Sequence, residues 1–498
     1  MCGRRLGVDP VSVPSRMSSL DASFLRVESP AAHMHVGWFS ALELPRGVAK
    51  LDAEALIEQI GSRLHLAPRF RQRVLEAPLG VAEPGWRDDP AFDIRRHVTV
   101  RTGPPLSAAA VRREVDDFLS EQLPRDRPLW SLLVLPSVQR GRAAFVGKVH
   151  HAMVDGLAAV ELGLLLFDAG PDAAPVRAAE WRPEGENGPV KVLLDSLADS
   201  AVEQFRAARR VAALGLSPGE GLRIASTLRK AALSLAEDAI NPAPRCALNV
   251  PIGPRRTLVK HRITMTRALA IKTHAGASLN DVILAIAAGA LRRLAVRQCQ
   301  EPCDLRVMVP VSVRRPDEDR GQGNRITFAF VDLPVSERSP TARLERVREQ
   351  MVALKESGEV AGTEILLRSV GSLPEPLKRR AAKLAASPRL YNLTISNVPG
   401  PRIPLYAAGA RVRSIYPVIP IPEDHALSLG VLSYDDGLHF AVYADPEALP
   451  DAGRLPVMLE EATEELAAAV RPTGARAEQP RRRRGAHERN SLTSTRAG

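Results

Sequence analysis

The stretch His150-His151-Ala152-Met153-Val154-Asp155-Gly156 organises the chain. Before it, residues 143–149 alternate in the manner of a strand, and after it residues 157–167 are almost entirely apolar, which predicts a buried helix. The stretch therefore occupies a strand-to-helix turn. Gly156 supplies backbone freedom there, and Asp155 is suited to a cap or a salt bridge at the helix start. Adjacent histidines point in different directions, so if one packs away from a site, the other faces it.

Length and composition indicate a large intracellular globular protein. The 498 residues leave room for two or three domains, and a hydrophobic content of 45% is enough for sizeable cores. The four cysteines are too few and too scattered for a disulfide framework. Cys299 and Cys303 lie four residues apart, but no His or Cys pair nearby completes a zinc site, so we expect ordinary thiols and no metal. Free thiols fit a reducing cytoplasm.

The net charge of +11 is concentrated at the C-terminus. Residues 471–498 contain eight arginines and two glutamates, which gives +6 and leaves +5 on the rest of the chain. This tail lacks apolar periodicity, so it is predicted to be disordered. Such a basic run either contacts anionic lipid or nucleic acid, or is a solvated tail without a specific role. We expect no specific nucleic-acid partner.

No targeting or membrane-spanning segment is expected. No apolar stretch approaches the ~18 residues of a spanning helix. Residues 1–16 lack the apolar core of a signal peptide, so they are either a disordered extension or precede a true start at Met17. The expected location is the cytoplasm, with peripheral contact to the inner membrane or to lipid droplets as a further expectation.

The first half of the chain alternates strands and helices around the histidine motif. Residues 36–44 read as a strand, residues 51–64 have helical spacing, and Ser107 is expected to cap a helix. Pro128-Leu129-Trp130 leads into a strand, and a turn at residues 139–141 leads to the strand that ends at the motif. The motif is therefore expected on a hairpin inside a sheet, which is a rigid place to hold a base.

Three arginines, Arg69, Arg71 and Arg73, follow the helix predicted at residues 51–64. They are expected to form a solvated rim, with contact to the phosphate groups of a ligand as the alternative.

Residues 170–188 are rich in Pro, Ala, Glu and Gly and read as the start of a linker. Two basic amphipathic helices are predicted at 190–214 and 221–240, either packed on the protein or lying in a bilayer interface.

The second half again mixes strands and helices. The expected strands are 261–269, 306–313, 324–333, 393–398, 412–418, 427–433 and 438–443, the last two joined by a hairpin at Asp436-Gly437. The expected helices are one capped at residues 276–282 and ending near Val296, then 343–355, 366–384 and 455–470. No glycine-rich dinucleotide or phosphate loop is present.

A bare histidine pair is more often structural than catalytic, but the full H-H-x-x-x-D-G string resembles the motif of the CoA-dependent acyltransferase superfamily. From Met17 to about Val470 the chain resembles bacterial wax ester synthase/diacylglycerol acyltransferases. In addition to the histidine motif, the matching signatures are Leu20-Asp21-Ala22-Ser23-Phe24, Pro128-Leu129-Trp130, Asn280-Asp281-Val282, Val309-Pro310-Val311-Ser312, Gly323-Asn324 and Ser396-Asn397-Val398-Pro399-Gly400-Pro401. One departure is Asp424, which stands where the family commonly has Gly before His425-Ala426.

The resemblance implies an α/β (α+β) fold of two chloramphenicol-acetyltransferase-like lobes, with mixed sheets flanked by helices. We expect an extension at 1–16, an N-terminal lobe at 17–170, a helical linker at 171–250, a C-terminal lobe at 251–470 and a tail at 471–498. The active site is expected in the tunnel between the lobes.

The implied reaction is transfer of a long-chain acyl group from acyl-CoA to a lipid hydroxyl. By resemblance His151 is the general base, and Asn280 is the candidate donor to the oxyanion or the substrate. His150, Asp155 and Gly156 are expected to shape the motif, with Asp155 holding the loop through an arginine or the backbone. Neither a metal nor a bound cofactor is required, since acyl-CoA is a substrate.

Tunnel contacts are expected from Pro128, Leu129 and Trp130 on one side and from Asn397, Pro399 and Gly400 on the other. Diacylglycerol is favoured as acceptor because the Arg- and Ala-rich composition is typical of high-GC bacteria, where triacylglycerol is the commoner product of this family. A long-chain alcohol, giving wax ester, is the alternative. A carrier-dependent condensation enzyme and a non-catalytic lipid-binding protein also remain open.

Overall fold

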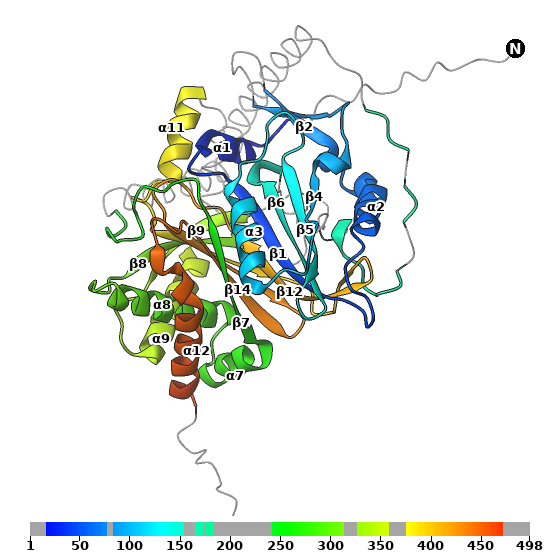
Figure 1. Cartoon of the computed structure of the whole chain (residues 1–498). Helices are drawn as coiled ribbons and strands as arrows, with labels where there is room; N and C mark the ends of the chain where they lie inside the picture. The colour runs from blue at the N-terminus through cyan, green and yellow to red at the C-terminus, as the bar shows by residue number, and fades with distance from the viewer. Residues whose placement is uncertain are drawn as a thin grey trace, which may run out of the picture.

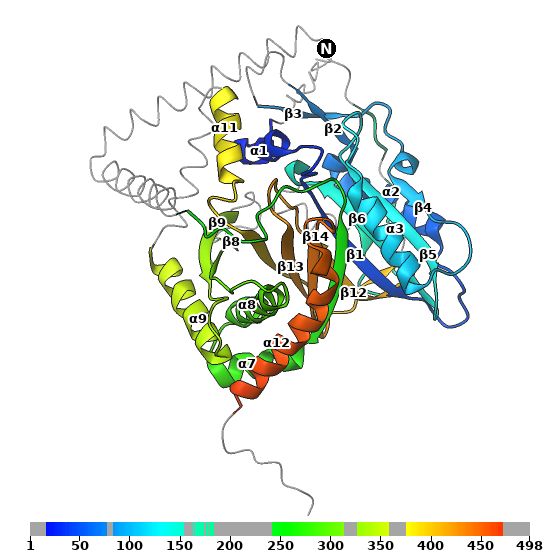
Figure 2. The same ribbon diagram turned by 60° about the vertical axis from the view of Figure 1, so that its left-hand side comes forward.

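The computed structural model describes residues 16–76, 83–153, 163, 165–173, 176–178, 180–183, 242–312, 326–357 and 375–471. In these residues the chain forms two lobes, each built on a six-stranded sheet with helices packed against it (Figures 1 and 2). Both sheets contain parallel as well as antiparallel pairs. The predicted class, α/β (α+β) with mixed sheets flanked by helices, is confirmed.

The N-terminal sheet carries the histidine motif on a central strand. Its order is β11-β12-β1-β6-β5-β4. The strands are β1 (His35–Glu43), β4 (Val98–Val100), β5 (Trp130–Val138), β6 (Arg142–His150), β11 (Tyr406–Ala407) and β12 (Ala410–Val418). The predicted hairpin is present, because β5 pairs antiparallel with β6. A separate two-stranded sheet joins β2 (Gln72–Leu75) to β3 (Gly85–Asp88).

Among the described residues, three α-helices belong to this lobe: α1 (Ser19–Val27), α2 (Ala53–Arg63) and α3 (Ala108–Ser120). The Ser107 hydroxyl accepts the backbone N–H of Ala110 at the start of α3, so the predicted cap is confirmed. Val115 and Leu119 of α3 are buried in a core between the lobes, together with Val418 and Tyr443. Helix α3 therefore helps to hold the two lobes together.

The C-terminal sheet has the order β7-β14-β13-β10-β8-β9. Its strands are β7 (Thr257–Thr264), β8 (Leu305–Ser312), β9 (Ile326–Leu333), β10 (Leu393–Pro399), β13 (Leu427–Tyr434) and β14 (Gly437–Ala444). The helices are α7 (Met265–Ala275), α8 (Leu279–Arg297), α9 (Pro340–Ser357), α11 (Glu375–Ala385) and α12 (Leu455–Ala469). Helix α8 is buried along most of its length, packs against α9 and α12, and begins with a capping box between Ser278 and Asp281.

One predicted strand is wrong in its second half. The expected strand at 261–269 ends at Thr264, and α7 begins at Met265. Thr264 has an extended backbone, and its hydroxyl accepts the N–H of Arg267, so a helix cap interrupts the strand pattern. The helices predicted at 190–214 and 221–240 lie outside the described residues. The helix predicted at 366–384 is described only from Glu375 onwards.

Strands β11 and β12 cross from the C-terminal half of the sequence into the N-terminal sheet. Strand β12 pairs antiparallel with β1 from Gly37↔Val418 to Glu43↔Arg411, with a bulge between Ala41 and Leu42. The expected start of the C-terminal lobe at residue 251 therefore does not separate the two sheets completely, because β11 and β12 come from that part of the chain. Figure 1 shows β12 beside β1.

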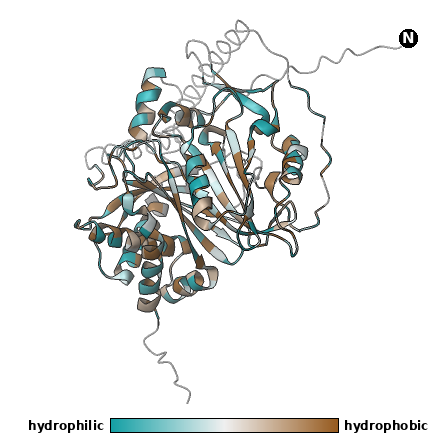
Figure 3. Cartoon of the chain, viewed as in Figure 1, coloured by the Kyte–Doolittle hydropathy of each residue, from teal (hydrophilic) through white to brown (hydrophobic). Residues whose placement is uncertain are grey.

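Hydrophobic residues gather along the strands, whereas α11 is largely hydrophilic (Figure 3). None of the described helices is both long enough and apolar enough to cross a bilayer.

The centre of the N-terminal sheet has no room for an added side chain at Gly37. A Cβ there would lie 2.5 Å from the carbonyl oxygen of Gly147 on β6, and β12 pairs with β1 on the other side. We expect Gly37→Ala to lower the free energy of unfolding by about 1–3 kcal/mol, measured by urea denaturation. Gly170→Ala is the matched control, because a Cβ there meets nothing within 4 Å, and equal loss in both variants would contradict this reading.

Candidate active site

The two histidines leave the end of β6 with their backbone held from both sides. The His150 N–H donates to the Leu129 carbonyl at 2.9 Å, and the His151 N–H donates to the Met34 carbonyl at 2.9 Å. The motif then continues as a 3₁₀ turn over His151–Met153. Because these hydrogen bonds hold the backbone from both sides, the positions from which the two imidazoles project are fixed.

His150 is completely buried, and its ring is fixed by two neighbours. Its Nδ1 accepts the N–H of Ala152 at 3.1 Å, so in the neutral ring the proton lies on Nε2. Nε2 faces Glu28 Oε1 at 3.6 Å, and Glu28 is ion-paired with Arg125. Burial, with smaller contributions from Arg125 and His151, holds the pKa of His150 well below its usual range. His150 is therefore a neutral group inside the lobe.

His151 has different surroundings. Its ring stacks on Phe24, with centroids 3.8 Å apart and planes at 15°. Burial lowers the pKa of His151 to about 4, so the ring is neutral at neutral pH. Nδ1 is buried and has no hydrogen-bond partner among the described residues. A neutral imidazole of this kind is able to accept a proton from a bound hydroxyl.

The stacking residue Phe24 is placed by α1. Arg26 of the same helix forms an ion pair with Glu375 of α11 at 2.7 Å and also pairs with Glu83. Because α11 lies in the C-terminal half of the sequence, the ring that packs on His151 is tied to the other lobe. The sequence contained Phe24 in a family signature, but its contact with His151 was not predicted.

Two asparagines from distant parts of the sequence, Asn280 and Asn397, lie in contact with each other. Asn280 is the second residue of α8, and its Oδ1 accepts from Asn397 Nδ2 at 3.4 Å. Strand β10 then ends at Pro399, and the Gly400 N–H donates to the Ser433 hydroxyl at 3.2 Å. A Cβ at Gly400 would lie 2.3 Å from the Ser433 carbonyl oxygen, so this close approach requires glycine.

Pro128, Leu129 and Trp130 lie on the other side of the motif, inside the N-terminal lobe. All three are buried, and the Trp130 indole donates to the Phe70 carbonyl at 2.8 Å while stacking on His97. In the described structure these residues thus contact the core of the N-terminal lobe. Asp155 and Gly156 lie outside the described residues, as do most of residues 157–167.

The solvated rim expected at Arg69, Arg71 and Arg73 is wrong for Arg71, whereas Arg69 and Arg73 are half-buried. Arg71 is buried and its guanidinium packs over the Trp181 ring, while Arg69 packs over Trp86. Arginine fits such a place because its planar group stacks on aromatic rings.

Sequence reasoning missed a buried polar chain between the lobes. His35, which pairs with His150 in the sheet, contacts Tyr443 of β14 through Nε2 at 3.0 Å, and the Tyr443 hydroxyl donates to the Leu119 carbonyl at 3.1 Å. With that proton committed, His35 Nε2 is the donor to Tyr443. Nearby, Lys148 donates to the carbonyls of Phe118 and Glu121. A lysine and a histidine within buried strands were the available signals.

Among the described residues, no cluster of His, Cys, Asp or Glu is arranged to hold a metal ion.

The arrangement matches known two-lobed structures. The wax ester synthase/diacylglycerol acyltransferase from Marinobacter aquaeolei superposes with a TM-score of 0.65 at 23% identity, covering 92% of this chain and 99% of that one. The first condensation domain of the calcium-dependent antibiotic synthetase gives 0.56 at 18% identity, with 92% and 97% covered. The chain thus has a condensation-domain-like fold.

Sequence comparison places the chain more narrowly. The family model described as wax ester synthase/diacylglycerol acyltransferase catalytic domain matches residues 17–283, and that of the WS/DGAT C-terminal domain matches residues 322–467. A probable diacylglycerol O-acyltransferase of Mycobacterium tuberculosis is 31% identical over 465 residues, which is 90% of this chain and 98% of that protein. The chain belongs to the wax ester synthase/diacylglycerol acyltransferase family.

The buried histidines predict loss of stability in acid. Burial lowers the pKa of His33, His151 and His439 to about 4, whereas an unfolded histidine titrates near 6.5. Between these values the unfolded chain binds more protons, so the free energy of unfolding rises with pH through this window and is lower at pH 5 than at pH 7.5. Urea midpoints at the two pH values measure the difference.

A variant isolates one of these groups. His439 is 1% exposed, and neither of its ring nitrogens has a hydrogen-bond partner among the described residues. We expect His439→Gln to reduce the change between pH 5 and pH 7.5 by as much as about 2 kcal/mol, which is the part of the linkage for a pKa shift from 6.5 to about 4 that falls in this window. His274→Gln, at an exposed position on α7, is the control. A pH-independent midpoint in the wild type would contradict the assignment.

Proposed function

We propose that this protein transfers a long-chain acyl group from acyl-CoA to the free hydroxyl of diacylglycerol, forming triacylglycerol. Membership of the family and the name of the mycobacterial relative support this activity. The observation that carries the proposal is the neutral His151 ring, fixed on Phe24 at the end of β6. A long-chain alcohol acceptor, which yields wax ester, is the second candidate because the family name covers both products.

In the proposed reaction His151 accepts the hydroxyl proton as the acceptor oxygen attacks the thioester carbonyl. The C–O bond forms, the carbonyl becomes an oxyanion, and collapse of this intermediate breaks the C–S bond. The imidazolium then returns its proton to the CoA thiolate, so the enzyme ends unchanged. Burial keeps the imidazole neutral before the reaction, which leaves it able to act as a base.

Asn280 is proposed to stabilise the oxyanion. Its Oδ1 accepts from Asn397, so the Asn280 amide NH₂ is the group left to donate. Donors fixed before the reaction stabilise developing charge at little reorganisation cost. The contacts of His150 support a structural role, since one ring nitrogen is committed to Ala152 and the other faces Glu28. Asp155 is proposed to hold the loop that follows.

The proposal requires only acyl-CoA and the lipid acceptor, without a further cofactor. A carrier-dependent condensation enzyme would instead take its acyl group from a carrier-bound thioester, and a silent lipid-binding protein would transfer none. Both alternatives are separated from the proposal by one assay with purified protein.

That assay offers labelled palmitoyl-CoA with diacylglycerol and with hexadecanol in parallel. We expect triacylglycerol to be the main product. His151→Ala should lower the rate at least ~100-fold, the usual contribution of a general base, while circular dichroism shows an unchanged fold. His274→Ala is the control for loss of a histidine elsewhere. Retention of half the rate in His151→Ala would overturn the mechanism, and dominant wax ester would overturn the choice of acceptor.

We also propose peripheral contact with an anionic membrane or lipid-droplet surface. The support is the +6 charge of residues 471–498 and the basic composition of the predicted linker helices.

We expect binding to phosphatidylglycerol vesicles to weaken with added salt, because exposed charges are screened over ~8 Å at physiological ionic strength. Deletion of residues 472–498 should weaken binding further, as measured by vesicle co-sedimentation. Binding that is insensitive to both salt and the deletion would contradict an electrostatic contact.

A further inference from the structure

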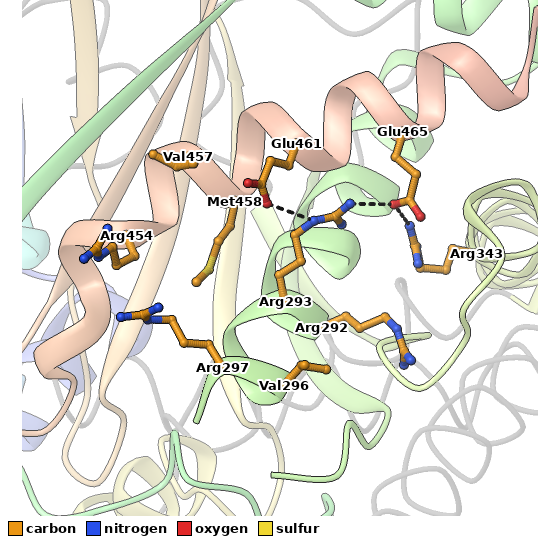
Figure 4. Close-up of a pocket in the computed structure, with 10 residues that line it drawn as sticks. All are labelled: Arg292, Arg293, Val296, Arg297, Arg343, Arg454, Val457, Met458, Glu461 and Glu465. Carbon is orange, nitrogen blue, oxygen red and sulfur yellow. Dashed lines mark hydrogen bonds and ion pairs between the residues drawn. The ribbon is translucent and has the colours of Figure 1, made fainter. Parts of the chain in front are cut away.

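A cavity of about 650 Å³ lies in the C-terminal lobe, where α8, α9 and α12 meet (Figure 4). Its walls are helix faces: residues 292, 293, 296 and 297 come from α8, and residues 454, 457, 458, 461 and 465 come from α12 and the position before it. Such spacing places side chains on one side of each helix. The volume lies within the range of small-molecule sites. We call this space the arginine cavity.

Five arginines and only two glutamates line the arginine cavity, an excess of three positive charges. The two acids are already engaged: Glu461 pairs with Arg293, and Glu465 pairs with both Arg293 and Arg343. Figure 4 shows these ion pairs at one end of the cavity. The acids therefore leave the opposite end cationic.

At that opposite end lie Arg297 and Arg454, with their guanidinium groups on the same side of the cavity (Figure 4). The side chain of Arg454 makes no hydrogen bond or ion pair with any described residue, and it is exposed. Arg297 has one partner, Asp451, at 3.0 Å. Arg292, which points toward the same end as Arg343 in Figure 4, donates to the carbonyls of Val335 and Ser336. Deeper in the wall, Arg343 is 2% exposed and its Nε has no partner among the described residues.

Apolar side chains that are exposed to solvent border the cationic end. Val296 is 56% exposed and Val457 is 58% exposed, and both belong to the short set of large hydrophobic side chains exposed in the described structure. Figure 4 shows Met458 between Val457 and Val296. Both features could be satisfied together by a ligand with an anionic head and an apolar chain.

We propose that the arginine cavity is a second lipid site, which binds a phospholipid carrying a phosphate monoester head, as in phosphatidate. The head is held by Arg297 and Arg454, whose forked N–H groups suit phosphate oxygens, and the acyl chain lies on Val296 and Val457. A phosphate monoester carries close to two negative charges at neutral pH, which matches two guanidiniums better than a zwitterionic head does. The site involves none of the residues proposed for catalysis.

Calorimetric titration of the full chain with dihexanoylphosphatidic acid tests the proposal, because its short chains keep the lipid monomeric. Inorganic phosphate and dihexanoylphosphatidylcholine are the comparison ligands. We expect phosphatidic acid to bind at least ~10-fold more tightly than either, since phosphate lacks the chains and phosphatidylcholine lacks the anionic charge. Equal binding of inorganic phosphate, or of phosphatidylcholine, would overturn the proposal.

Variants separate this site from general attraction to a basic protein. Arg297→Gln and Arg454→Gln should each weaken phosphatidic acid binding about 10-fold, as expected for loss of a charge-assisted hydrogen bond. Arg413→Gln is the matched control: it also removes one exposed arginine paired with a single acid, Glu43, but on β12. Val457→Asn should weaken binding of the lipid and leave that of inorganic phosphate unchanged. An equal effect of Arg413→Gln, or no effect of the two cavity variants, would contradict the site.

The result is independent of the proposed acyl transfer. His151→Ala should bind phosphatidic acid at the arginine cavity like the wild type, even if transfer is lost. Loss of binding in that variant would place the lipid in the catalytic tunnel instead and would overturn the second site.

Discussion

Two backbone hydrogen bonds, one from each side, fix the end of β6, and the rest of the site depends on this constraint. The backbone N–H groups of His150 and His151 are committed to carbonyls on opposite sides, from Leu129 and Met34. His150 is the last residue of β6 and His151 is the first residue of the 3₁₀ turn, and the two rings have different neighbours. One ring enters the lobe toward Glu28, and the other stacks on Phe24. The different roles proposed for the two histidines rest on this difference in surroundings.

Burial gives both rings the same protonation state but leaves them different hydrogen-bonding capacity. Each pKa is lowered mainly because the charged form loses its solvation. The Nδ1 of His150 is occupied by a backbone N–H, whereas the Nδ1 of His151 has no partner among the described residues. Neutrality alone therefore does not distinguish a base from a structural histidine. The proposed assignment therefore rests on the neighbours of each nitrogen.

Local features of the fold were predictable from the sequence. The β5–β6 hairpin and the caps at Ser107 and Ser278 depend on residues close together in the chain, and all are present. Features that join distant segments were not predictable. The Phe24–His151 stack and the Asn280–Asn397 pair each require the assembled lobes, and nothing in periodicity or spacing specifies them. The strand predicted through residue 269 failed because a single capping threonine outweighed the apolar pattern.

Strand β12 comes from the C-terminal half of the sequence but completes the N-terminal sheet, and this has a consequence for synthesis of the chain. Strand β1 is made early, but the partner on one of its sides is residues 410–418, so hundreds of residues must be translated before that side can pair. Until then the early lobe presents an open strand edge, the kind of surface that pairs with other chains. Completion of the first lobe thus waits for nearly the whole polypeptide. Nascent chains shorter than about 420 residues are the form of this protein most in need of chaperone protection.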